Sequence, residues 1–288
     1  MKETKKNNNN NAHLYGYING VRMNDFERDG KKMTAINLDV VTMETYKVDG
    51  NFQNKRTYHD VVLFTDDQKL IKSLAAIATD VTANRENRDV EGFKPKTHTI
   101  SVDGILVNKE NSIKGSEQTY TTLQFVASEP SIDLDVKQAD KEVRNRAELS
   151  GNIAKVNIYE EQGFATANLV HHYRPDGAEK EFETSIQIRV DGNRKFSKET
   201  YEALKKGEMG VGDFIRVGGQ LHNNNYENEQ GKRYGMALDV TSSELLHKKG
   251  EKQEVKAEKK PAKKAEEKAA KKAEPKKATP RKKGVKIG

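Results

Sequence analysis

Residues 14–21 read Leu-Tyr-Gly-Tyr-Ile-Asn-Gly-Val and residues 149–156 read Leu-Ser-Gly-Asn-Ile-Ala-Lys-Val, so the pattern Leu-x-Gly-x-Ile-x-x-Val occurs twice. A second pair follows in the same order. Residues 100–106 read Ile-Ser-Val-Asp-Gly-Ile-Leu, and residues 215–221 read Ile-Arg-Val-Gly-Gly-Gln-Leu. Two ordered matches indicate an internal duplication. The sequence therefore predicts two homologous domains, at residues 12–130 and 146–246, joined by a linker at residues 131–145.

Each predicted domain consists mainly of strands. Apolar residues alternate with polar ones, which is typical of strands with one buried face. The alternating positions are Ile36, Leu38, Val40, Ile186, Ile188 and Val190. A helical spacing replaces this alternation once per domain, in residues 70–78 and in residues 201–204, the latter behind Ser197 as a predicted N-cap.

Glycines interrupt the predicted strands at Gly16, Gly104, Gly151 and Gly219. Such glycines mark bulges or sharp bends, where a small sheet curls into a barrel. Several strands with one short helix before the last pair fit the five-stranded OB-fold, and an open sandwich is the alternative. We therefore expect an all-β chain of two tandem OB-fold barrels, each with one short helix.

The ends of the chain differ in composition from the predicted barrels. Residues 1–11 carry charges and an asparagine run, which predicts a disordered N-terminus rather than a signal peptide. Residues 247–288 hold 17 Lys and Arg against 6 Glu, a net charge of +11, in a low-complexity Lys/Ala-rich stretch that predicts a disordered tail. The remaining residues hold 34 basic and 38 acidic side chains, a net charge of −4. A nucleic-acid site on the barrels must therefore depend on local cations and stacking rather than on bulk charge.

The composition also excludes several classes of site. The 288 residues include no cysteine, so disulfides, thiolate zinc sites and cysteine nucleophiles are absent. No run approaches the ~20 apolar residues of a membrane span. No catalytic motif occurs, and neighbouring strand residues such as His171 and His172 face opposite sides, which argues against a metal site and for a surface position. We expect a cytoplasmic protein that is not an enzyme and has no metal or cofactor.

Four segments resemble the bacterial single-strand DNA-binding protein family. Residues 58–64 (Tyr-His-Asp-Val-Val-Leu-Phe) resemble the family's third-strand motif, and residues 102–106 and 120–122 resemble its Gly-x-Leu and Arg-Tyr-Thr-Thr elements. Residues 206–221 resemble its Lys-Gly-Asp-x-Val-x-Val-x-Gly-x-Leu signature. The resemblance spans both domains but neither terminus. It implies an OB-fold that wraps single strands non-specifically, with four barrels in the working assembly and hence a homodimer of this chain.

The candidate DNA-binding residues of the first domain combine rings for bases with cations for phosphates. Tyr58 and Phe64 share one face of their strand, roughly 20 Å apart at ~3.3 Å per residue. Tyr46 lies near a position where the family carries a stacking aromatic. The candidate phosphate contacts are Lys47, Lys55 and Arg56. The alternative is that Phe64 belongs to the core and Tyr58 only covers an edge.

The second domain keeps fewer of these features. Tyr226 falls where the family places an aromatic in a long hairpin, and Tyr173 and Phe182 are further candidate platforms. Glu183 is the expected counterpart of Tyr58. The candidate cations are Arg174, Arg189, Arg216 and Arg233. We expect this domain to bind DNA more weakly or to serve assembly.

The leading hypothesis is a protein that binds and protects single-stranded DNA during replication, recombination and repair. Its basic tail adds salt-sensitive contacts to duplex DNA or RNA, which predicts association with the nucleoid. The main alternative is a structural or nucleoid-packing protein that holds duplex DNA through the tail. A third interpretation is an RNA-binding OB-fold protein.

Overall fold

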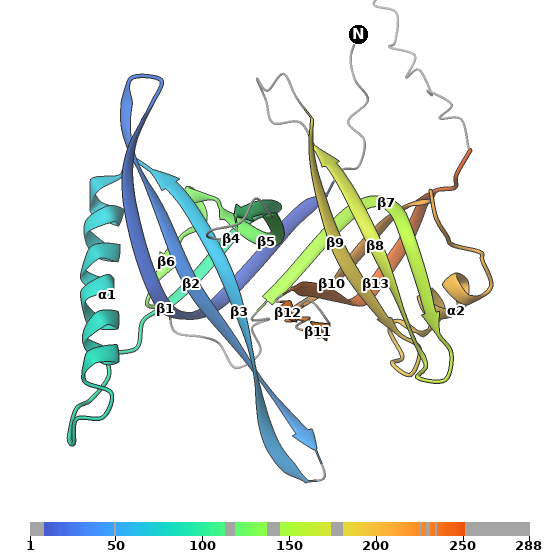
Figure 1. The fold of residues 1–288 in the computed structure, drawn as a ribbon, viewed down its shortest axis with the longest axis horizontal. Coiled ribbons are helices and arrows are strands. Elements are labelled where there is room, and N and C mark those ends of the chain that lie inside the picture. The colour runs from blue at the N-terminus through green and yellow to red at the C-terminus, as the bar shows by residue number, and fades with distance from the viewer. Residues whose placement is uncertain are drawn as a thin grey trace, which may run out of the picture. The chain divides into compact units, whose positions relative to one another are not determined.

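In the first barrel, β1 (Asn10–Arg28), β2 (Lys31–Val48) and β3 (Asn51–Thr65) form an antiparallel meander. The computed structural model describes residues 9–48, 50–112, 119–136, 145–173, 181–224, 226–228, 231–233 and 235–250. β4 (Thr99–Ser112) and β5 (Thr119–Ala127) complete the barrel, because β5 pairs in parallel with β3 and β4 pairs with β1. α1 (Gln68–Glu86) connects β3 to β4 (Figure 1).

The second barrel repeats this topology. β7 (Asn145–Tyr159), β8 (Phe164–Tyr173) and β9 (Phe182–Asp191) form the meander, and α2 (Lys198–Lys205) precedes β10 (Phe214–Asn223). β13 (Met236–His247) pairs in parallel with β9, and β10 closes on β7. A short hairpin of β11 (Tyr226–Asn228) and β12 (Gly231–Arg233) lies between β10 and β13. The predicted all-β class with tandem five-stranded barrels and one helix in each is confirmed.

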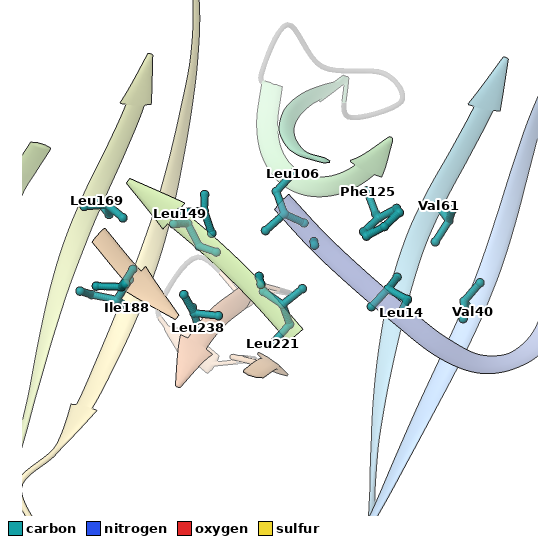
Figure 2. Packing of buried hydrophobic residues seen from close by; sticks show 14 of the residues in the cluster. Leu14, Val40, Val61, Leu106, Phe125, Leu149, Leu169, Ile188, Leu221 and Leu238 are labelled. Atoms are coloured by element: carbon teal, nitrogen blue, oxygen red, sulfur yellow. The ribbon is translucent and has the colours of Figure 1, made fainter. Parts of the chain in front are cut away.

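Inward side chains fill each barrel, as Figure 2 shows for Leu14 and Phe125 in the first and for Leu149 and Leu238 in the second. The predicted alternation is confirmed, since all six alternating positions are buried. A side chain at Gly16 or Gly151 would lie closer than 3.0 Å to the carbonyl oxygen of Val41 or Val170, so only glycine fits where each first strand bends. The first strand of each barrel can bend at these glycines because the carbonyl of the neighbouring strand lies where a side chain would otherwise be.

The two helices begin differently. Asp67 caps α1 by accepting from the backbone N–H of Lys69 at 2.8 Å. Ser197 precedes α2 as predicted, but its hydroxyl donates to the carbonyl oxygen of Asp191 instead of capping the helix. Neither helix in the described part of the chain has the length and apolar composition that crossing a membrane requires.

The barrels are joined by antiparallel pairing between the starts of β1 and β7. Asn10 was expected in the disordered N-terminus, but it is a strand residue whose amide donates to the carbonyl of Leu106 at 2.8 Å and accepts from its N–H at 2.9 Å. Asn145, expected in the linker, starts β7 and accepts from the N–H of Leu221 at 2.7 Å. The predicted linker also contributes β6 (Asp133–Leu134), behind the short 3-10 turn η1 (Glu129–Ser131). Asn10 and Asn145 are strand residues because both lie where β1 and β7 pair, whereas β6 pairs with β4 within the first barrel.

Candidate nucleic-acid interface

Alternation along β3 sends Tyr58 and Phe64 to the outside of the first barrel. Their side chains are 52% and 43% exposed, whereas the intervening His59 and Leu63 are buried. The edge of the Phe64 ring meets Phe26 of β1 at a centroid distance of 6.0 Å. Both predicted rings therefore present area to solvent, and neither belongs to the barrel core.

Tyr58 lines a groove of about 480 Å³, within the roughly 300–1,000 Å³ of typical ligand sites. Tyr120 of β5 lines the same groove and is 44% exposed. The opposite wall comes from the second barrel. The remaining lining residues are Asp60, Asn111, Thr122, Leu123, Asn223, Gly235 and Met236. The groove thus brings together two exposed tyrosines at the junction of the barrels.

Asparagine side chains tie the edge of each third strand to the opposite barrel. The N–H of Tyr58 donates to Asn223 Oδ1 at 3.3 Å, and Asn223 Nδ2 donates to the carbonyl of Arg56 at 3.4 Å. Asn108, with its amide oriented to satisfy both atoms, donates to the carbonyl of Ser185 at 3.1 Å and accepts from its N–H at 3.0 Å. The junction therefore holds the backbone beneath Tyr58.

The register of the strands identifies the counterpart of Tyr58 in the second barrel. Tyr58 pairs with Val41, and Ser185 pairs with Val170, the residue whose carbonyl packs against the equivalent glycine. The counterpart is thus Ser185, and the expected match of Glu183 is wrong by two residues. The alignment depends on Val41 and Val170, which lie on the strands next to β3 and β9. The spacing of residues along the third strand alone therefore could not reveal it.

Three buried histidines line the inward side of the sheets near the junction. Burial and the neighbouring His222 lower the pKa of His59 to about 3. Burial also lowers the pKa of His222 and of His171. The surface position predicted for His171 is wrong, because its Nδ1–H donates to the carbonyl of Ser150 at 2.7 Å inside the second barrel. All three rings are neutral at neutral pH and contribute no charge toward a phosphate.

Two of the predicted cations of the first barrel, Lys55 and Arg56, have exposed side chains on β3. Arg56 shares the outward face of Tyr58, whereas Lys55, an odd number of residues from Tyr58, points to the opposite face, where its charge helps to lower the pKa of His222. The backbone of Tyr46 and Lys47 lies in β2, opposite residues 53 and 52, while their side chains lie outside the described residues. The same holds for the side chains of Tyr226 and Arg233 and for the whole of Arg174.

Tyr173 and Phe182 lie on a different face from Ser185. They are directly paired across β8 and β9, and their rings stack at 5.6 Å, with His171 stacked on Tyr173 at 5.8 Å. Because Phe182 is an odd number of residues from Ser185, its side chain points to the inward side of the sheet. The pKa of the Tyr173 hydroxyl is raised by burial. The structure therefore does not bring these two platforms to the face that Tyr58 occupies in the first barrel.

The outward face of the second barrel carries a ring cluster that the sequence analysis missed. Tyr159 stacks on Phe164 at 4.6 Å, and the guanidinium of Arg189 lies 4.8 Å from the Phe164 ring centroid. Arg189, a predicted contact, is exposed there. Arg216 is instead held by the carboxylate of Glu244 at 3.1 Å. The sequence around Arg189 carries no signal for this cluster, because the two rings come from the neighbouring strands β7 and β8.

The fold resembles that of the single-stranded DNA binding protein from Thermus aquaticus. The wild-type structure matches with a TM-score of 0.51 and 17% identity, over 84% of this chain and 95% of that chain. A deletion mutant of the same protein matches with a TM-score of 0.50 and 17% identity, over 84% and 96% of the two chains. No protein-family model and no curated sequence matches the chain. The resemblance stated from the motifs is therefore confirmed at the level of the fold, that of two OB-fold barrels in one chain.

Proposed function

We propose that this protein binds single-stranded DNA independently of its base sequence, by stacking bases on the outward rings of the first barrel. The observation that carries the proposal is the pair of exposed tyrosines, Tyr58 and Tyr120, on the walls of one groove. Each base stacked on an aromatic ring contributes roughly 1 to 3 kcal/mol. Two or three such rings give tight binding even though the barrels are net acidic.

The cations next to these rings support the same proposal. Arg56 is exposed on the same face of β3 as Tyr58 and two residues away, where it would meet a phosphate between stacked bases. The basic residues 252–288 add contacts that depend on salt and not on strandedness. On this proposal the protein acts on DNA in replication, recombination or repair, at the nucleoid, as a homodimer of four barrels. It performs no chemical step.

Removal of the tail separates this function from duplex packing. We expect the full chain and a chain ending at Glu251 both to bind labelled oligo(dT) more tightly than a duplex of equal length, in fluorescence anisotropy over a salt series. The cut at Glu251 keeps the contact between the N–H of Lys249 and Asp213 at 2.8 Å. Loss of all binding on truncation would contradict the proposal and favour the duplex-packing alternative. An RNA oligomer of equal length that competes better than oligo(dT) would favour an RNA ligand.

A further inference from the structure

We propose that Phe52, on the hairpin of β2 and β3, is a third stacking ring that extends the single-strand site beyond the body of the first barrel. This inference rests on the proposed function and lengthens its site. Phe52 lies six residues before Tyr58, as Tyr58 lies six residues before Phe64. β3 pairs with β2 without a register shift from Thr65 to Asn51, so the three rings share the outward face of the strand.

The ring of Phe52 lies on an arm, formed by residues 43–48 and 51–56, that extends past the barrel (Figure 1). Every side chain of residues 51–56 is exposed, whereas Thr57 is buried where the strand enters the barrel. Phe52 itself is 77% exposed, more than either Tyr58 or Phe64. A ring that buries so little area contributes little to folding, so most of its surface is open to a ligand.

The outward face of the arm has the local charge that a nucleic acid requires. Arg56 is exposed on that face, between Phe52 and Tyr58. Asn54 beside it accepts from the hydroxyl of Thr45 at 2.8 Å, which ties the two strands together next to Phe52. Among the described side chains of this face, none between the tip of the arm and Tyr58 is acidic. A phosphate is therefore attracted here by a nearby cation, although the barrels as a whole are net acidic.

The spacing of the three rings sets the length of the site. Phe52 and Phe64 lie roughly 40 Å apart along the strand at ~3.3 Å per residue, twice the separation of Tyr58 and Phe64. Paired strands twist, so a bound chain would follow the rings around the arm. A DNA strand that reaches all three rings therefore needs a length toward the upper end of the ~4–16 nucleotides that one OB-fold covers.

The paired part of the corresponding hairpin is shorter in the second barrel. β9 begins at Phe182, three residues before Ser185, whereas β3 begins at Asn51, seven residues before Tyr58. Six residues before Ser185 the sequence has Glu179, which offers no ring to a base. The third ring is therefore inferred for the first barrel alone.

Titration of labelled oligo(dT) on the full chain tests the role of Phe52. We expect Phe52→Ala to weaken binding of an oligomer of about 16 nucleotides roughly tenfold, because one stacked base is lost. An oligomer of about 4 nucleotides can still use Tyr58 and Phe64, so its Kd should change less than twofold. Phe52→Leu keeps an apolar side chain without a ring and should bind like Phe52→Ala. As a matched control, Phe196→Ala removes a ring that is 76% exposed two residues before α2, and it should leave both Kd values unchanged.

Tryptophan fluorescence reports the stacking directly, because the chain contains no tryptophan. Phe52→Trp should bind the longer oligomer at least as tightly as the wild type, and its emission should be quenched when a base stacks on the indole. Phe196→Trp should show no such quenching.

Wild-type affinity of Phe52→Ala or Phe52→Leu for the longer oligomer, while Tyr58→Ala weakens it, would overturn this inference and leave the proposed function standing. An equal loss in Phe196→Ala would overturn it as well, as would unquenched emission of Phe52→Trp at saturation. If Tyr58→Ala, Phe64→Ala and Phe52→Ala all bind like the wild type, the proposed function itself fails and the third ring with it.

Discussion

The two barrels share one backbone plan but differ on their outward faces. Inward positions of the third strands are alike, since Val61 and Ile188 are both buried. Four outward positions of β3 are replaced in β9. The pairs are Tyr58 and Ser185, Asp60 and Gln187, Val62 and Arg189, and Phe64 and Asp191. The comparison teaches that buried positions stay apolar because they build the barrel, while outward positions are free to differ, as the proposed base stacking on the first barrel alone requires.

The second barrel also has outward aromatic rings, but they lie on β7 and β8 rather than on β9 itself. Phe164 on β8 is directly paired with Asp191, the counterpart of Phe64. Its ring is stacked on Tyr159 and lies against Arg189, whereas the ring of Phe64 meets, among the rings of the described residues, only the edge of Phe26. We therefore expect the second barrel to contribute mainly through Arg189 and less through free ring faces.

The largest effect should come from the rings of the first barrel. Tyr58→Ala and Phe64→Ala should each weaken oligo(dT) binding more than tenfold, and the double variant about a hundredfold, because each removes a stacked base. The matched variants Ser185→Ala and Asp191→Ala should change Kd less than twofold. Equal losses in both sets, measured by titration with labelled oligo(dT), would remove the distinction between the barrels.

A second difference lies inside the barrels, where His59 corresponds to Ile186. The pKa of His59 falls from 6.5 to about 3 on folding, so its stabilising effect is complete above pH 6.5 and is lost as the pH falls toward 3. The free energy of unfolding should therefore drop by about 2 kcal/mol between pH 7 and pH 5 from this residue alone. His171 and His222, whose pKa values are also lowered, add to the drop.

Urea denaturation at the two pH values measures this effect. His59→Ile, which copies the second barrel, should reduce the drop by about 2 kcal/mol whatever it does to stability at pH 7. An unchanged drop in that variant would mean that other groups carry the pH dependence.

The smallest effect should be at Arg189. Arg189→Gln should weaken binding about two- to threefold and reduce the slope of log Kd against log salt by about one, since one phosphate contact is lost. Oligomers too short to reach the second barrel should bind as before. An effect on these short oligomers would place Arg189 in the same site as Tyr58.

Local periodicity explains why much of the fold was predictable. Alternation in residues 36–40 and 186–190 depends only on the neighbours in the chain, and it correctly predicted the buried faces of both barrels. The outward position of Tyr58 and Phe64 followed from the same rule. The strand-end asparagines Asn10 and Asn145 were assigned to flexible segments, because an isolated asparagine carries no signal for the backbone that it will bind.

The sequence by itself determined two barrels, their buried faces and an exposed tyrosine on the third strand, because these follow from duplication and a period of two. Only the tertiary structure decided that Asp60 and Tyr120 share a groove, that Ser185 replaces Tyr58, and that His171 is buried. The physical reason is that such relations depend on the register between strands far apart in the chain. Packing of the closed barrels sets that register, and no local spacing records it.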